Sequence, residues 1–373
     1  MTMATGTWIK HPGFYIEEEL EARGWLQRDL AFIIGCPEQA INMIVSGKRG
    51  ITPEMAKALG DAFDISPETF ANLQKSYELA HATNPYQGVA ERRVMQDRLP
   101  VRAMIQRGWI QNSDVAMLEE QLRRFFGGKS LDEISQLRFA AKKPNRDIQP
   151  AQLAWLYRVQ NLAKEMPATK YSEKKLHSAL TEFAGMTIEP EQVRHIPRVL
   201  SECGVRYVVV EKLPNASIDG VCFWLDKDSP VIGMSLQHDQ IDNFWFVLRH
   251  EVEHVLDRHG QKEMIVDVDL DKSESTGTEE EERLANDAAA NFCIPQDKLD
   301  SFIQRKQPFF YQKDVISFAR VQHRHPGIAV GQLRRRLGRY DYLTKYLYSF
   351  KIRALVLPGA VADGWGQVIP TSL

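Results

Sequence analysis

The sequence of 373 residues lacks the features that mark secreted and membrane-spanning proteins. Its four cysteines are scattered, with no Cys-x-x-Cys pair, so they predict no disulfide framework. The first ten residues lack the basic start and apolar stretch of a signal peptide. The apolar run at residues 244–248 is far shorter than the ~18 residues of a membrane helix. We therefore expect a cytoplasmic protein with reduced cysteines and no membrane partner.

A strong excess of one charge is also missing, because the formal net charge is only −2. This excludes a molecule that is basic as a whole, so any contact with DNA must come from a local patch. The apolar fraction of 43% is ordinary for a folded protein, and the length favours two or three domains.

The hydrophobic pattern predicts a mostly α protein with a small β-sheet, an α+β fold. Short helices with turn signals fill residues 14–80, and further helical patterns cover 89–106, 113–126 and 150–166. Three β-branched and aromatic runs, at 205–210, 221–225 and 231–235, predict three short strands. Helical patterns then return at 239–259, 281–292 and 313–323.

Composition suggests four regions along the chain. We expect a helix-turn-helix domain over residues 1–83, then a linker at 84–88 that opens a helical connector over 84–200. A domain with the strands and a metal motif should cover 201–340, followed by a C-terminal tail at 341–373. The connector shows amphipathic periodicity but no recognisable chemistry, so packing is its expected role.

A His-Glu-x-x-His motif lies at residues 250–254, inside a helical pattern. His250 and His254 are four residues apart, so both imidazoles project from one helix face and suit one Zn²⁺ ion. Glu251 is then placed to hold and deprotonate the attacking water, as a general base. The alternative is a pair of histidines with ordinary roles in helix packing.

Glu282 is the candidate third metal ligand. It shares a helix face with Asn286, and a carboxylate one turn before a small polar group suits a ligand with an orienting neighbour. The alternative is an acidic helix start that the helix dipole favours, since glutamates occupy all of 279–282. The strands before the motif helix predict an edge strand beside the metal, to which an extended peptide can add.

Residues 27–44 have the spacing of a helix-turn-helix. The small side chain of Ala31 lets two helices cross closely, and Gly35 permits the tight turn between them. Ile41 packs the second helix against the first. The second helix would expose amide and carboxylate groups to base edges, with basic groups placed for phosphates. The alternative is a helical bundle used only for protein contacts. The candidate DNA-binding residues are Arg28, Glu38, Gln39, Asn42, Ser46, Lys48 and Arg49.

Several segments between residues 204 and 337 resemble the ImmA/IrrE metallopeptidase family. They are the sequences DGVCFW at 219–224, PVI at 230–232, DNFWF at 242–246 running into the His-Glu-x-x-His motif, and HPGIAVGQL at 325–333. The resemblance implies a zincin-like domain in which His250, His254 and Glu282 bind zinc and Glu251 acts as general base. His325 is a candidate stabiliser of an oxyanion, or else a structural cap of the turn that follows it.

Residues 11–79 resemble the HigA antitoxin branch of Xre/Cro-like regulators, through HPG at 11–13 and GKRGITPEMA at 47–56. Together the resemblances imply an antitoxin-like transcriptional regulator with a zinc-dependent endopeptidase domain. Its expected partners are double-stranded DNA at the operator of its own operon, a second copy of the chain, and a cognate toxin or peptide substrate. The alternative is a non-catalytic DNA-binding antitoxin whose peptidase-like domain senses a ligand or binds a toxin.

Overall fold

The computed structural model describes residues 9–83, 86–134, 148–261, 265–269, 274–275, 278–339, 343 and 351–364. Residues 84 and 85 of the predicted linker and much of the predicted tail lie outside these ranges. The chain divides into two compact units, Met1–Gln87 and Gly88–Leu373. Within the described ranges, no helix has the length and apolar character needed to cross a membrane.

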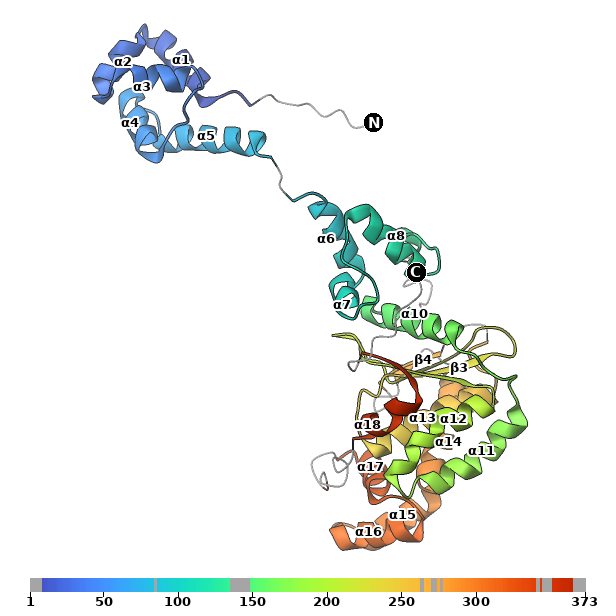
Figure 1. The fold of residues 1–373 in the computed structure, drawn as a ribbon. Helices are drawn as coiled ribbons and strands as arrows, with labels where there is room; N and C mark the ends of the chain where they lie inside the picture. Colours follow the sequence, from blue (N-terminus) through green and yellow to red (C-terminus); the bar gives the residue numbers. More distant parts are fainter. Residues whose placement is uncertain are drawn as a thin grey trace. The chain divides into compact units, whose positions relative to one another are not determined.

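The first unit is a bundle of short helices (Figure 1). Thr52 and Ser66 begin two of them, because each hydroxyl accepts a hydrogen bond from a backbone amide of the first turn. A proline follows each cap at the first helical position, where no intrahelical N–H bond is lost. The helices are α1 (Pro12–Arg23), α2 (Gln27–Ile34), α3 (Glu38–Val45), α4 (Pro53–Phe63) and α5 (Pro67–His81).

Helices α2 and α3 form the predicted helix-turn-helix. Gly35 ends α2 with a φ of 75°, a left-handed conformation that favours glycine. Ala31 from α2 and Ile41 and Ile44 from α3 are buried in the same core. Because these side chains fix the two helices against each other, the outer face of α3 is left for contacts.

Within the described residues, the second unit contains a six-stranded mixed sheet in the order β5-β4-β2-β3-β1-β6. Strand β1 runs parallel to β3 and β6, and the other neighbours are antiparallel. The three predicted strands are confirmed as β1, β2 and β3, whereas the other three were not predicted. The strands are β1 (Arg206–Val210), β2 (Gly220–Trp224), β3 (Pro230–Met234), β4 (Ile265–Asp269), β5 (Glu274–Ser275) and β6 (Val361–Asp363).

Helices cover both faces of this sheet, and they enclose two apolar cores. The core on one face is shared by α6 (Val89–Arg98), α7 (Val101–Gln106), α8 (Val115–Phe125) and α10 (Pro150–Glu165), of which α10 packs against β1. On the other face, α12 (Ile196–Glu202) packs against β1, and α13 (Ile241–Leu256) packs against β2 and β3. The core on that face is also shared by α11 (Glu173–Met186), η1 (Pro190–His195), α14 (Glu279–Cys293), α15 (Gln296–Lys306), α16 (Gln312–Val321), α17 (Pro326–Leu337) and α18 (Ile352–Val356), which η4 (Leu357–Gly359) extends.

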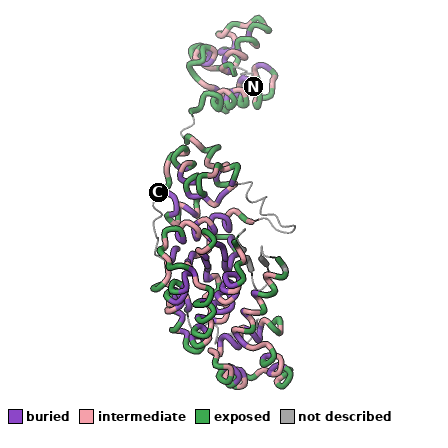
Figure 2. Tube along the Cα trace, turned by 90° about the vertical axis from the view of Figure 1, so that its right-hand side faces the viewer, coloured by how far each residue is buried: buried purple, intermediate pink, exposed green. Residues whose placement is uncertain are grey.

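Apart from Arg206 at the start of β1, the central strands are apolar and buried, because both of their faces are covered. In β1, Val208 and Val210 point into one core, and Tyr207 and Val209 point into the other. Figure 2 shows the resulting band of buried residues through the middle of the second unit. In a sheet with one solvent-exposed face, polar and apolar residues alternate along each strand. Strands covered on both faces lack this alternation and appear in the sequence as continuous apolar runs.

The region predicted as a connector and the region predicted as a tail both supply parts of this unit. Helix α10 packs against β1, and β6 forms one edge of the sheet. Arg158 of α10 and Asp363 of β6 form an ion pair with both side chains fully buried. Arg107, just after α7, donates hydrogen bonds to the carbonyls of Gly364 and Lys212, each at 3.0 Å.

The edge strand expected beside the metal is not one of the three predicted strands, because none of them is an edge of the sheet that the described residues form. Strand β2 lies between β4 and β3, strand β3 between β2 and β1, and strand β1 between β3 and β6. Strand β4 pairs with Gly220–Cys222 of β2, and β6 pairs with Val208–Val210 of β1, so a peptide could not add to these parts of the strands. The sequence could not reveal this, because the covering strands β4 and β6 come later in the chain.

Candidate functional site

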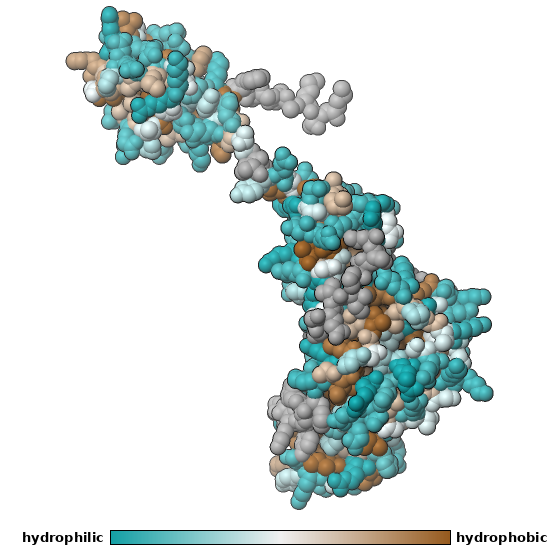
Figure 3. Space-filling model, in the orientation of Figure 1, coloured by the Kyte–Doolittle hydropathy of each residue, from teal (hydrophilic) through white to brown (hydrophobic). Residues whose placement is uncertain are grey.

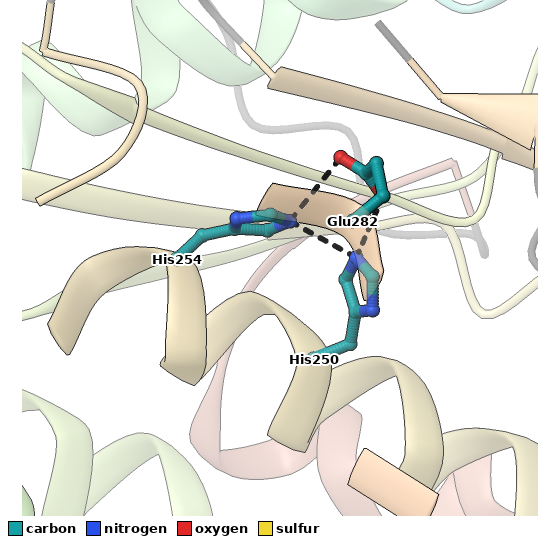
Figure 4. A group of neighbouring side chains, drawn as sticks. All are labelled: His250, His254 and Glu282. Carbon is teal, nitrogen blue, oxygen red and sulfur yellow. Dashed lines mark hydrogen bonds and ion pairs between the residues drawn. The ribbon is translucent and has the colours of Figure 1, made fainter. Parts of the chain in front are cut away.

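Helix α13 brings His250 and His254 together on its buried face. Both side chains are fully buried, and their Nε2 atoms lie 3.0 Å apart. Glu282, in the first turn of α14, points at the same place (Figure 4). Its Oε2 lies 3.4 Å from His250 Nε2, and its Oε1 lies 3.6 Å from His254 Nε2.

The close approach of α13 and α14 depends on small residues in α14. Ala285 and Ala289 are spaced by one turn and fully buried, while Val252 and Val255 of α13 are buried nearby. A larger side chain at 285 or 289 would push the helices apart and move Glu282 away from the histidines. The packing of the two helices therefore determines the geometry of the cluster.

The three side chains fit a divalent transition metal. In the described part of the chain, His250, His254 and Glu282 form the group whose ligand atoms all lie within 4.8 Å of one another. Two imidazole nitrogens and one carboxylate are a ligand set that zinc prefers, with one position left for water or substrate.

The adjacent Glu281 has a different role, which separates it from Glu282. Thr278 and Glu281 form a capping box at the start of α14, in which Glu281 Oε2 accepts a hydrogen bond of 2.8 Å from the Thr278 amide. Consecutive helix residues point about 100° apart, so only one of two neighbouring glutamates faces the histidines. The structure gives that place to Glu282.

Glu251 lies directly after His250 on α13, and its side chain is fully buried. Its carboxylate lies against the backbone of β2 at Gly220. A Cβ atom at position 220 would stand only 1.9 Å from Glu251 Oε1. Glycine at 220 therefore leaves room for the carboxylate in this position, a feature that the sequence did not reveal.

His325 begins α17, where its Nδ1 accepts a hydrogen bond of 3.1 Å from the Gly327 amide. Burial lowers the pKa of the His325 imidazole, which favours the neutral form that this cap requires. His11 caps α1 in the same way within the same His-Pro-Gly sequence. The geometry thus gives His325 a structural role, and it is not among the residues of the metal-ligand group.

His259 is a residue of the site that sequence reasoning missed. It follows the end of α13, and its Nδ1 lies 3.0 Å from His254 Nδ1. Its side chain is 17% exposed, and its Nε2 lies 4.0 Å from Glu281 Oε1. The only signal in the sequence is a third histidine five residues beyond the motif.

The candidate DNA-contact residues of the first unit all lie on its surface. Glu38, Gln39 and Asn42 are exposed on α3, and Arg28 is exposed on α2. Ser46, Lys48 and Arg49 are exposed in the turn after α3. Asn42 Nδ2 donates to Gln27 Oε1 over 3.3 Å, which links the two helices at the surface. The visible face of this unit is mostly hydrophilic (Figure 3).

Two family models match the chain. The helix-turn-helix family matches residues 16–70, and the IrrE N-terminal-like domain of peptidase family M78 matches residues 204–324. The second range contains His250, Glu251, His254, His259 and Glu282.

Among curated proteins, virulence-associated protein A' of Dichelobacter nodosus is 37% identical over 71 residues, 19% of this chain and 62% of that protein. An uncharacterized HTH-type transcriptional regulator of Escherichia coli, YddM, is 32% identical over 71 residues, 19% of this chain and 76% of that protein. The chain thus matches less than two thirds of the first of these relatives.

A solved structure of an addiction module antidote protein of a HigA family, from Coxiella burnetii, is 26% identical. The match covers 24% of this chain and 94% of that one, with a TM-score of 0.19. The two family models show that residues 16–70 are a helix-turn-helix domain and that residues 204–324 are an IrrE N-terminal-like domain of the M78 peptidase family.

Proposed function

We propose that this protein is an antitoxin-like transcriptional regulator whose second unit is a zinc-dependent endopeptidase. The observation that carries the proposal is the convergence of His250, His254 and Glu282, with Glu251 on the same helix, inside an M78 domain. The helix-turn-helix domain and the similarity to an HTH-type transcriptional regulator support the other half.

In this proposal His250, His254 and Glu282 would hold zinc, which supplies Lewis acidity toward a water molecule and a peptide carbonyl. Glu251 accepts the proton of the attacking water and delivers it to the departing amine nitrogen. Burial of Glu251 against Gly220 fixes its carboxylate in one orientation, so little reorganisation is needed when the proton moves. His325 is left out of this scheme, because its Nδ1 is used to cap α17.

A second candidate is a non-catalytic regulator whose M78 domain senses a ligand or binds a toxin. It is favoured by the full burial of His250, Glu251 and His254, since a substrate needs access to the attacking group. Cleavage assays with the cognate toxin and with the chain itself separate the two candidates.

The purified protein is expected to bind about one zinc per chain. Glu282→Ala should lose most of the affinity, because it removes an oxygen that faces both histidines. Glu280→Ala is the matched control, because Glu280 lies in the same helix turn and its side chain is exposed. Competition with a chromogenic chelator measures both. A wild-type affinity in Glu282→Ala beside a loss in Glu280→Ala would contradict the assignment.

The first unit is expected to bind an inverted repeat in the promoter of its own operon as a symmetric dimer. One recognition helix reads few base pairs, so two half-sites about one helical turn apart, or a multiple of that, should be required. Gln39→Ala and Asn42→Ala should relax sequence preference. Lys48→Ala should weaken binding to all duplexes and lower the salt slope by about 1.

Gel-shift titrations with the promoter fragment and a scrambled duplex of equal length measure these effects. Equal affinity for the two duplexes would contradict sequence-specific binding and would favour a protein-contact role for α3. A shift that corresponds to one chain per operator would contradict the dimer.

A further inference from the structure

We propose that His259 is a positioning residue that holds the His254 imidazole in the orientation and tautomer needed to ligate the metal. The inference rests on the proposed zinc site. His254 has two ring nitrogens, and both have close partners. Its Nε2 faces His250 and Glu282, whereas its Nδ1 lies 3.0 Å from His259 Nδ1. His259 therefore contacts the nitrogen that takes no part in the ligand cluster.

The chemistry of the contact fixes which atom donates. A neutral imidazole that ligates through Nε2 carries its proton on Nδ1. His254 Nδ1–H then donates to His259 Nδ1, and His259 carries its own proton on Nε2. Such a hydrogen bond from the far nitrogen sets the ring orientation and raises the basicity of the ligating nitrogen.

The backbone after α13 is built to bring His259 back to His254. Arg258 adopts a left-handed conformation with a φ of 56°, and the His259 amide donates to the His254 carbonyl over 2.8 Å. Gly260 has a φ of 77°, and a Cβ there would lie 2.7 Å from the Cys222 carbonyl. Two left-handed residues thus flank His259 and reverse the chain over a short distance.

Strand β2 anchors this turn. The His259 carbonyl accepts a hydrogen bond of 2.8 Å from Trp224 Nε1, and Cys222 Sγ lies 3.8 Å from the same oxygen. Because β2 also receives Glu251 at Gly220, one strand supports both the general base and the residue behind His254. These contacts hold the backbone of His259 in place beside β2.

Helix α14 meets His259 from the other side. Glu281 Oε1 lies 4.0 Å from His259 Nε2, the atom that carries the proton in the tautomer derived above. The capping box with Thr278 holds the Glu281 carboxylate in place. His259 is therefore placed between the end of the helix with two ligands and the start of the helix with the third.

The experiment compares His259→Ala with His259→Asn in the full-length protein. The Asn side-chain oxygen replaces the accepting Nδ1 at a similar distance from the backbone, whereas Ala removes it. His177→Ala is the control, because His177 is exposed on α11. Zinc affinity is measured by chelator competition, and the visible absorption of the Co²⁺-loaded proteins reports ligand geometry.

His259→Ala should weaken zinc binding by about 10–100-fold and shift the Co²⁺ bands, as is typical when an outer hydrogen bond to a ligand is lost. His259→Asn should restore most of the affinity and the wild-type bands, and His177→Ala should leave both unchanged. Wild-type affinity and bands in His259→Ala would overturn the proposal, as would an Asn variant no better than Ala.

The outcome also separates this inference from the proposed function. Wild-type protein that binds no zinc contradicts the metal site itself. Wild-type protein that binds zinc, with His259→Ala binding it equally well, contradicts only the role of His259. Thermal unfolding of the zinc-free proteins shows whether a variant has lost its fold. If His259→Ala has lost its fold, the comparison of His259→Asn with the wild type tests the role of His259.

Discussion

Replacing Glu251 with glutamine is expected to leave zinc binding intact and to lower peptide hydrolysis by about 10²–10⁴-fold, the usual contribution of a general base. Glutamine has nearly the same shape as glutamate, so it fills the buried space beside Gly220 without a new clash. The amide cannot accept the proton of the attacking water. The change therefore removes one chemical function and little packing.

The measurement is cleavage of the cognate toxin, of the chain itself and of denatured casein, alongside zinc content. Glu253→Gln is the control, because Glu253 lies on the same helix but pairs with Arg249 at 2.7 Å. Hydrolysis by Glu251→Gln at the wild-type rate would show that another group accepts the proton. No hydrolysis by the zinc-loaded wild type would favour the ligand-sensing alternative.

The second large effect is expected on stability, from the buried ion pair of Arg158 and Asp363. Both side chains are fully buried. Burial raises the pKa of Asp363, and the nearby Arg158 guanidinium lowers it by a smaller amount. Asp363→Ala leaves the Arg158 guanidinium buried without its carboxylate. Loss of one partner of a buried pair costs about 3–5 kcal/mol.

Urea unfolding followed by tryptophan fluorescence measures this loss. The double variant Arg158→Met/Asp363→Ala should be more stable than Asp363→Ala alone, because it removes the stranded charge as well. Asp97→Ala is the control, since the Arg93–Asp97 pair is exposed and should contribute less than about 1 kcal/mol. A loss no greater than that of Asp97→Ala would mean that water enters to solvate Arg158.

The features that could be predicted from the sequence depend on residues that are close together in the chain. The helical period alone places His250 and His254 on one face, and the Thr52-Pro53 pair marks the start of α4. The role of Glu282 was harder to predict, because four consecutive glutamates begin α14 and each of them fits an acidic first turn of a helix. Only the packing of α14 against α13 determines which of the four faces the histidines.

The parts that sequence missed depend on contacts between distant segments. Strand β6 has only three residues, too few for a periodic pattern, and its partner β1 lies some 150 residues earlier. Gly220 is one of many glycines until Glu251 is placed against it. His259 reaches His254 only because the chain turns at Arg258, which adopts a left-handed conformation although it is not a glycine. No local sequence pattern predicts this turn.

The pairing of β1 with β6 also affects the order in which the two units can fold during synthesis. The helices of the first unit end at residue 81, so they can fold while the ribosome is still translating the second unit. The sheet of the second unit has an open edge along β1 until residue 363 has left the ribosome. Pairing over so long a stretch of chain is intrinsically slow. A nascent chain can therefore present a complete helix-turn-helix well before the sheet of the second unit is complete.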